Sequence, residues 1–161
     1  MDAIKLLKQQ HRLVENLFSG FEDTDDDDEK EQLFFEIADN LAVHASIEER
    51  FFYPAVREKR TEERVDESYE EHLEMKKLLL DAMHSTDEPG FDGKVAALKG
   101  AVIHHVQEEE DELFPEVTQI LERDALEAIG QQMEAATEEM MAAGEPRNEV
   151  RVESEPPVIQ P

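Results

Sequence analysis

Apolar residues recur along most of the chain at alternating spacings of three and four, which is the period of an amphipathic α-helix. The first stripe holds Ile4, Leu7, Val14 and Phe18, and Asp2 ahead of it is a residue type that caps helices. Each later stripe runs up to proline or glycine, the residues that interrupt helices. The pattern predicts five helices, at about residues 2–21, from the acidic run at 23–28 to Pro54, 61–83, from the loop at 85–90 to Pro115, and 117–143.

Short connections between amphipathic helices favour neighbours that run antiparallel. We therefore expect an all-α fold, an antiparallel up-down-up-down four-helix bundle with an additional C-terminal helix. Residues 1–143 are the predicted domain, and Gly144 is expected to end its last helix. Residues 144–161 are acidic and rich in proline, so we expect a disordered tail there.

Composition limits the classes of function. The 161 residues hold 42 acidic and 16 basic side chains, a net charge of −26, which disfavours nucleic acid as a partner. Cysteine is absent, which excludes disulfides, zinc–thiolate sites and thiol nucleophiles. No apolar run approaches the roughly 20 residues of a membrane span, and no signal peptide is visible. We expect a cytoplasmic protein without a membrane association.

One stretch of sequence occurs twice, 61 residues apart. Each copy has a histidine, a pair of glutamates from four positions later, then an aromatic residue and a proline. An isolated histidine precedes each copy by 33 residues. The matching pairs are His11 and His72, His44 and His105, Glu48 and Glu109, Glu49 and Glu110, Tyr53 and Phe114, and Pro54 and Pro115.

Histidine and glutamate four residues apart project from the same side of a helix. In this chain they occupy core-facing positions of the apolar stripes, where an unpaired carboxylate is costly. A single buried histidine is more often a hydrogen-bonded core residue than a ligand, but six positions in one register indicate a shared metal centre. Two glutamates could bridge two ions, and imidazole with carboxylate suits iron, manganese or zinc. The candidate metal ligands are His11, His44, Glu48, His72, His105 and Glu109.

Four neighbours of these positions have other expected places. Glu49 and Glu110 directly follow the candidate glutamates and are expected to be exposed or to support the ligands. Tyr53 and Phe114 are expected to pack beneath the centre as part of the core.

The six positions, with Phe-Tyr-Pro54 and Leu-Phe-Pro115 closing the two halves, resemble the hemerythrin HHE cation-binding family over about residues 1–143. The resemblance implies a four-helix bundle that holds two iron ions, Fe²⁺ or Fe³⁺, bridged by two carboxylates and an oxo or hydroxo group. Iron is the metal that it implies, ahead of manganese or zinc.

One position departs from the oxygen-carrying members of that family. They have a further histidine ligand four residues after the one on the third helix, and here that position is Lys76. The nearest oxygen donor on the same face is Tyr69, a candidate replacement ligand. A missing protein ligand leaves one iron more open, so we expect binding of, or reaction with, O₂, peroxide or NO rather than oxygen transport.

The residues leave open whether such a protein is an enzyme, a sensor or a reversible binder. Iron delivery for the repair of iron–sulfur proteins, or an interaction module with a structural metal, are the alternatives.

Overall fold

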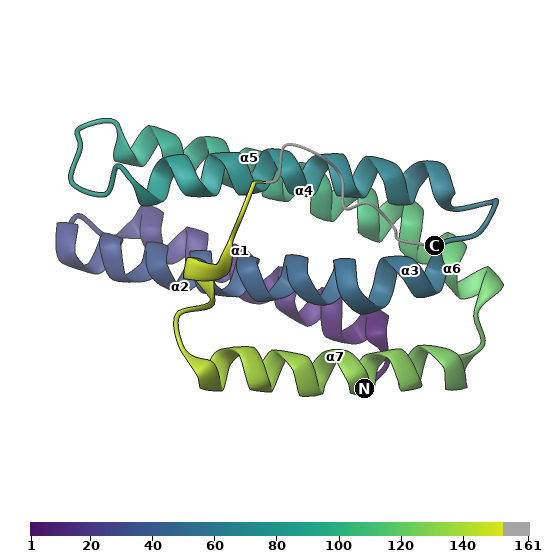
Figure 1. The fold of residues 1–161 in the computed structure, drawn as a ribbon. Helices are drawn as coiled ribbons and strands as arrows, with labels where there is room; N and C mark the ends of the chain where they lie inside the picture. Colours follow the sequence, from purple (N-terminus) through teal and green to yellow (C-terminus); the bar gives the residue numbers. More distant parts are fainter. Residues whose placement is uncertain (153–161) are drawn as a thin grey trace.

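The computed structural model describes residues 1–152 and consists of helices joined by turns. Four long helices form an antiparallel bundle, in which α1 pairs with α2 and α4 pairs with α5 (Figure 1). The predicted all-α, up-down-up-down bundle is therefore confirmed. Its helices are α1 (Ala3–Asp23), α2 (Asp27–Ile47), α4 (Glu62–Met83) and α5 (Phe91–Glu108).

Aspartates fix where the first two helices begin. Asp2 accepts a hydrogen bond of 2.9 Å from the N–H of Lys5, and Asp26 accepts one of 3.0 Å from the N–H of Glu29. Each bond satisfies one of the amide groups that a helix start leaves free. The acidic run between α1 and α2 thus acts as a cap, in agreement with its negative charge beside a helix N-terminus.

The two repeated prolines do not end their helices, in contrast to the sequence expectation. Each helix passes through a π-helical turn, η1 (Glu48–Phe52) and η2 (Glu109–Leu113), and continues as α3 (Tyr53–Val56) and α6 (Phe114–Ile120). Proline lacks an N–H group and clashes with the carbonyl four residues earlier in an α-helix. A π turn adds one residue, and its backbone hydrogen bonds span five residues instead of four. Pro54 and Pro115 therefore fit into the first turn of the α-helix that follows each π turn.

The fifth helix, α7 (Arg123–Ala143), begins later than predicted, because the extended backbone of Leu121 and Glu122 separates it from α6. It packs on α1 and α2, on the side away from α4 and α5 (Figure 1). Gly130 permits the close approach, since a Cβ atom there would lie 2.1 Å from the carbonyl oxygen of Met1. Gly144 follows α7 with a φ of 85°, as its predicted role in ending the helix requires.

The start of the predicted tail is ordered. Residues 146–149 form a short 3₁₀ helix, η3 (Pro146–Glu149), which packs on α2. Arg147 donates to Asp39 from its guanidinium at 2.9 Å and from its backbone N–H at 3.0 Å, and lies over the ring of Phe35. The apolar side chain of Val150 is buried. The expected disorder is therefore wrong for this part, and residues 153–161 of the predicted tail lie outside the described residues.

The core consists of two apolar clusters at opposite ends of the bundle. One surrounds Leu7, Tyr53 and Phe114, and the other surrounds Phe34 and Phe91. Buried histidines and glutamates occupy the layer between them, which is the place of the repeated motif. Over residues 1–152, no helix is both long and apolar enough to cross a membrane.

Candidate metal centre

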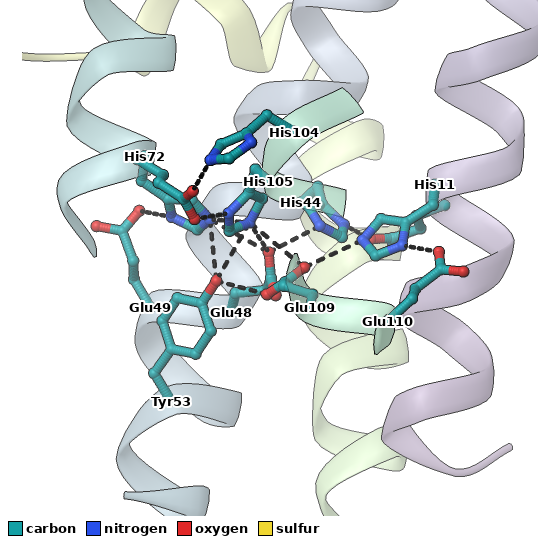
Figure 2. Close-up of polar contacts among 12 residues, drawn as sticks. His11, His44, Glu48, Glu49, Tyr53, His72, His104, His105, Glu109 and Glu110 are labelled. Atoms are coloured by element: carbon teal, nitrogen blue, oxygen red, sulfur yellow. Dashed lines mark hydrogen bonds and ion pairs between the residues drawn. The ribbon is translucent and has the colours of Figure 1, made fainter. Parts of the chain in front are cut away.

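The structure brings all six predicted ligands together in the interior. None is more than 4% exposed, and their side chains point toward one another from four helices (Figure 2). They fall into two groups of three whose ligand atoms lie within 4.8 Å of one another. Group one is His11, His44 and Glu109, and group two is Glu48, His72 and His105.

The two carboxylates lie between the groups. Oε1 of Glu48 is 2.7 Å from Nε2 of His44 in group one and 3.3 Å from Nε2 of His72 in group two. Oε1 of Glu109 is 3.2 Å from Nε2 of His11 and 3.3 Å from Nε2 of His105. Each glutamate therefore faces histidines of both groups, which is the arrangement that a pair of bridging carboxylates requires.

All four histidine rings turn Nε2 inward and bind an oxygen acceptor through Nδ1. Such a bond fixes the tautomer with hydrogen on Nδ1 and leaves the Nε2 lone pair for a metal. The acceptors are Glu110 for His11 at 2.6 Å, Gln10 for His44 at 2.7 Å, Glu49 for His72 at 3.1 Å and Glu71 for His105 at 2.9 Å.

The inner atoms lack well-aligned hydrogen bonds. Nε2 of His44 and both oxygens of Glu48 are buried and make no hydrogen bond of good geometry, although Nε2 of His44 and Oε1 of Glu48 lie 2.7 Å apart. A buried polar atom without a well-formed hydrogen bond is costly. Nε2 of His72 and Nε2 of His105 lie 3.1 Å apart, and two lone pairs at that distance repel unless a cation or proton lies near. Nitrogen and carboxylate donors in this set fit iron, manganese or zinc.

The acids and histidines shift each other's pKa. Burial raises the pKa of Glu48, but the facing histidines, His44 first, outweigh burial and bring the pKa well below its usual range. Burial lowers the pKa of His105, but Glu109, Glu48 and Glu71 outweigh it and hold the pKa well above its usual range. The centre thus favours bound positive charge next to its carboxylates.

Tyr53 belongs to the centre, whereas the sequence placed it in the core beneath. Its hydroxyl donates to Oε2 of Glu109 at 2.7 Å and lies 3.1 Å from Nε2 of His72. Burial, with the charges of Glu109 and Glu48, raises the pKa of Tyr53 well above its usual range, so the phenol holds its proton. Phe114, at the matching position, has no such group and stacks on the ring of His11.

The two residues considered for the missing ligand position lie outside the centre. Within the part of the chain that the structure describes, the hydroxyl of Tyr69 reaches only the backbone oxygen of Glu49, at 3.4 Å. Lys76 points to the outer carboxylate of Glu49, with Nζ 2.9 and 3.1 Å from its oxygens. The lysine therefore acts on His72 through Glu49 and faces no inner ligand atom.

The outer acceptors were only partly foreseen. Glu49 and Glu110 were expected to be exposed or to support the ligands, and they support them. Gln10 and Glu71 were missed, although each directly precedes a ligand histidine and the pair obeys the same offset of 61. That offset, applied to every polar side chain near a ligand, is the signal that would have found them.

A comparison with protein families agrees with this geometry. The model of the hemerythrin HHE cation binding domain matches residues 2–117. The chain belongs to the hemerythrin HHE family. The match to this HHE domain covers both groups of candidate ligands and the two repeated prolines. The resemblance inferred from the sequence is thereby confirmed, and the domain is one that binds cations.

Two relatives place the HHE domain among known proteins. A protein described as a DNA nickase, from Nostoc sp. (strain PCC 7120), is 31% identical over 138 residues, which is 84% of this chain but 39% of the nickase. The crystal structure of an HHE cation binding domain-containing protein from Mycobacterium kansasii has a TM-score of 0.79 at 22% identity and covers 96% of each chain. This second likeness shows that the fold is shared.

Proposed function

We propose that this chain is a non-haem di-iron protein whose buried centre binds or reacts with a small oxidant, O₂, peroxide or NO. The four terminal ligands would be His11, His44, His72 and His105. Glu48 and Glu109 would bridge the two ions. Iron in such a centre supplies redox chemistry and open coordination positions. The observation that carries the proposal is the convergence of six buried histidine and glutamate side chains, in which Nε2 of His44 and both oxygens of Glu48 make no well-aligned hydrogen bond.

The protein's own residues would hold the centre rigid and dry. Each imidazole is fixed by its outer acceptor, which also raises its strength as a ligand. The hydroxyl of Tyr53 holds a proton beside the histidines of group two. It uses that proton to donate a hydrogen bond of 2.7 Å to the carboxylate of Glu109. Group one is different, because Phe114 closes that side with a ring that neither donates nor accepts.

A small cavity supports an uncharged diatomic or similarly small ligand. Its volume is about 10 Å³, and it adjoins the rings of His11, His44 and His105. A space of this size admits about one water-sized molecule. Its other walls are mostly apolar, which disfavours a hydrated ion, and are made by Gln10, Val14, Leu41, Met75, Val102 and Val106.

We do not extend DNA nicking to this chain. The nickase is more than twice as long as the matched segment, since the chain spans 39% of it. A net charge of −26 repels a phosphate backbone. We therefore propose that the segment shared with the nickase is the cation-binding part.

Anaerobic loading with Fe²⁺ tests the proposal. We expect two iron ions per chain and an absorption spectrum that changes on addition of air, peroxide or NO. Glu48→Gln should lose at least one ion, because it removes a bridging charge, whereas His84→Ala on the exposed end of α4 should retain both. Turnover of peroxide would make the protein an enzyme, and a reversible change would make it a binder.

Three results would contradict the proposal. A chain that takes up no iron lacks the centre. Rapid release of iron to a chelator, without a reaction with any oxidant, would favour iron delivery. A loaded centre that is inert to all three oxidants would favour a structural metal in an interaction module.

A further inference from the structure

A second cluster of metal-binding side chains lies on the surface of α4 and α5. It consists of His104 and Glu108, one turn apart on α5, and Glu71 on α4. His104 is the exposed member, at 64% of its side chain, and Figure 2 shows it beside His105 at the margin of the buried centre. Over residues 1–152, this is the one such group outside the centre itself.

The distances in this cluster fit one ion. Nε2 of His104 lies 3.2 Å from Oε2 of Glu71 and 3.2 Å from Oε1 of Glu108. Ligand atoms at the bond lengths of tetrahedral Zn²⁺ are about 3.3 Å apart. The ligand atoms of the two carboxylates lie within 4.8 Å of each other, so one imidazole and two carboxylates can take three positions around one ion and leave the fourth to water.

The positions equivalent to these three in the first half of the repeat are covered by α7. Subtracting the offset of 61 from Glu71, His104 and Glu108 gives Gln10, Val43 and Ile47. In that half, Val43 and Ile47 are buried in the same apolar cluster as Met133 and Ala136 of α7. Gln10 contacts Thr137 of α7 at 3.5 Å.

Among the described residues, the second half has no counterpart of α7 on this face. His104 and Glu108 stand where the first half has the buried Val43 and Ile47, and Glu71 stands where it has Gln10. Two of these three polar side chains are carboxylates, whose negative charge favours a cation.

We propose that His104, Glu108 and Glu71 form a third, solvent-open site for a divalent transition metal of the Zn²⁺, Co²⁺ or Fe²⁺ type. The site goes beyond the proposed di-iron function and does not depend on the chemistry of that centre. It shares Glu71 with it, because one oxygen of Glu71 faces His104 and the other accepts from Nδ1 of His105 at 2.9 Å. The carboxylate of Glu71 would thus connect an ion at the surface to the buried ligand His105.

Zinc titration of protein whose buried centre has already been filled tests the site. We expect a third equivalent of Zn²⁺, and a change in the ring ¹⁵N resonances of His104 when it binds. His104→Ala and Glu108→Gln should each weaken this equivalent at least about tenfold, since even the loss of an outer partner costs about 10–100-fold in metal affinity. Neither variant removes a residue of the buried centre.

Two matched controls separate a specific site from general surface binding. His84→Ala removes the other exposed histidine, and Glu74→Gln removes an exposed acid of α4. Both should leave the third equivalent unchanged.

Three results would each overturn the site. His104→Ala could keep the third ion, the two control variants could lose as much zinc affinity as His104→Ala, or the wild type could bind only two equivalents. Two tight ions in those cases would still support the di-iron centre. Zinc binding that needs His104, in a protein that binds no tight buried ions, would support the surface site and contradict the di-iron centre.

Discussion

The hydroxyl of Tyr53 donates a 2.7 Å hydrogen bond to the carboxylate of Glu109, which lies 56 residues later in the chain. This bond joins the two halves of the repeat and has no counterpart at Phe114. The same hydroxyl lies 3.1 Å from Nε2 of His72 in group two, whereas Phe114 stacks on His11 in group one. The two groups therefore differ chemically, although each half of the chain supplies two histidines and one glutamate. The two ions of a filled centre should therefore differ in their surroundings.

Tyr53→Phe should lower the free energy of unfolding of the metal-free protein by about 1.5–3 kcal/mol, the usual value for a hydrogen bond to a charged group. The loss should shrink in the metal-loaded protein, where a cation satisfies Glu109. Urea unfolding of both forms measures the difference. Tyr69→Phe is the control and should cost less, because its hydroxyl makes only a 3.4 Å contact. Equal losses in the two variants would refute the distinction.

Glu49→Gln should weaken the binding of one of the two ions by about 10–100-fold, since the carboxylate of Glu49 fixes the ring of His72. Lys76→Gln should have a smaller effect. It removes a partly exposed ion pair, and such pairs contribute about 0–1 kcal/mol. Competition with a chelator gives both affinities. A larger effect at Lys76 than at Glu49 would mean that the ammonium acts on the centre directly.

The stability of the metal-free protein should fall above neutral pH. Burial lowers the pKa of His11 and of His72, but the facing glutamates outweigh it and raise both above the ordinary value of 6.5. A raised histidine pKa stabilises the fold below 6.5, and this stabilisation is lost as the pH rises through the folded value. The lowered pKa of Glu48 works in the opposite sense, since its stabilisation is present above 4.5 and lost as the pH falls through the folded value.

Calorimetry at about pH 5.5 and about pH 8.5 checks this dependence. The Tm of the metal-free protein should be higher at the lower pH. Metal binding needs neutral imidazoles, so the increase in Tm on loading should be larger at the higher pH. A metal-free Tm that rises with pH over this range would show that the histidines are not charged in the fold.

Arg147→Ala should release the segment after α7 from α2. The change removes the ion pair with Asp39 and the contact with Phe35, and we expect a loss of about 1–3 kcal/mol in the free energy of unfolding. Limited proteolysis should then cut near η3, while the iron content stays unchanged. Arg151→Ala is the control, because within residues 1–152 Arg151 bonds only to backbone oxygens of its own segment. Loss of iron in Arg147→Ala would show that the segment also supports the centre.

Most of the fold could be predicted, because helical periodicity and the offset of 61 are properties of sequence alone. The six candidate ligands are also visible in this way, since each half repeats the same residue types at the same spacing. The π turns could not be predicted. One extra residue inside a helix leaves composition and capping signals unchanged, and the proline behind it looks like an end to the helix.

The remaining misses involve polar atoms whose partners come from distant parts of the chain. The ring of Tyr53 fits the same apolar pattern as that of Phe114, so its hydroxyl gave no signal. Gln10 and Glu71 lie on the polar side of their helices, where a solvated side chain is the default expectation. Arg147 binds Asp39 across 108 positions, a contact that no local pattern encodes.

The π turns η1 and η2 start 61 residues apart, so they share the offset that relates the ligands of the two halves. Each triad of ligands takes two residues from one half and one from the other. Neither half of the chain could therefore complete a three-residue cation site alone.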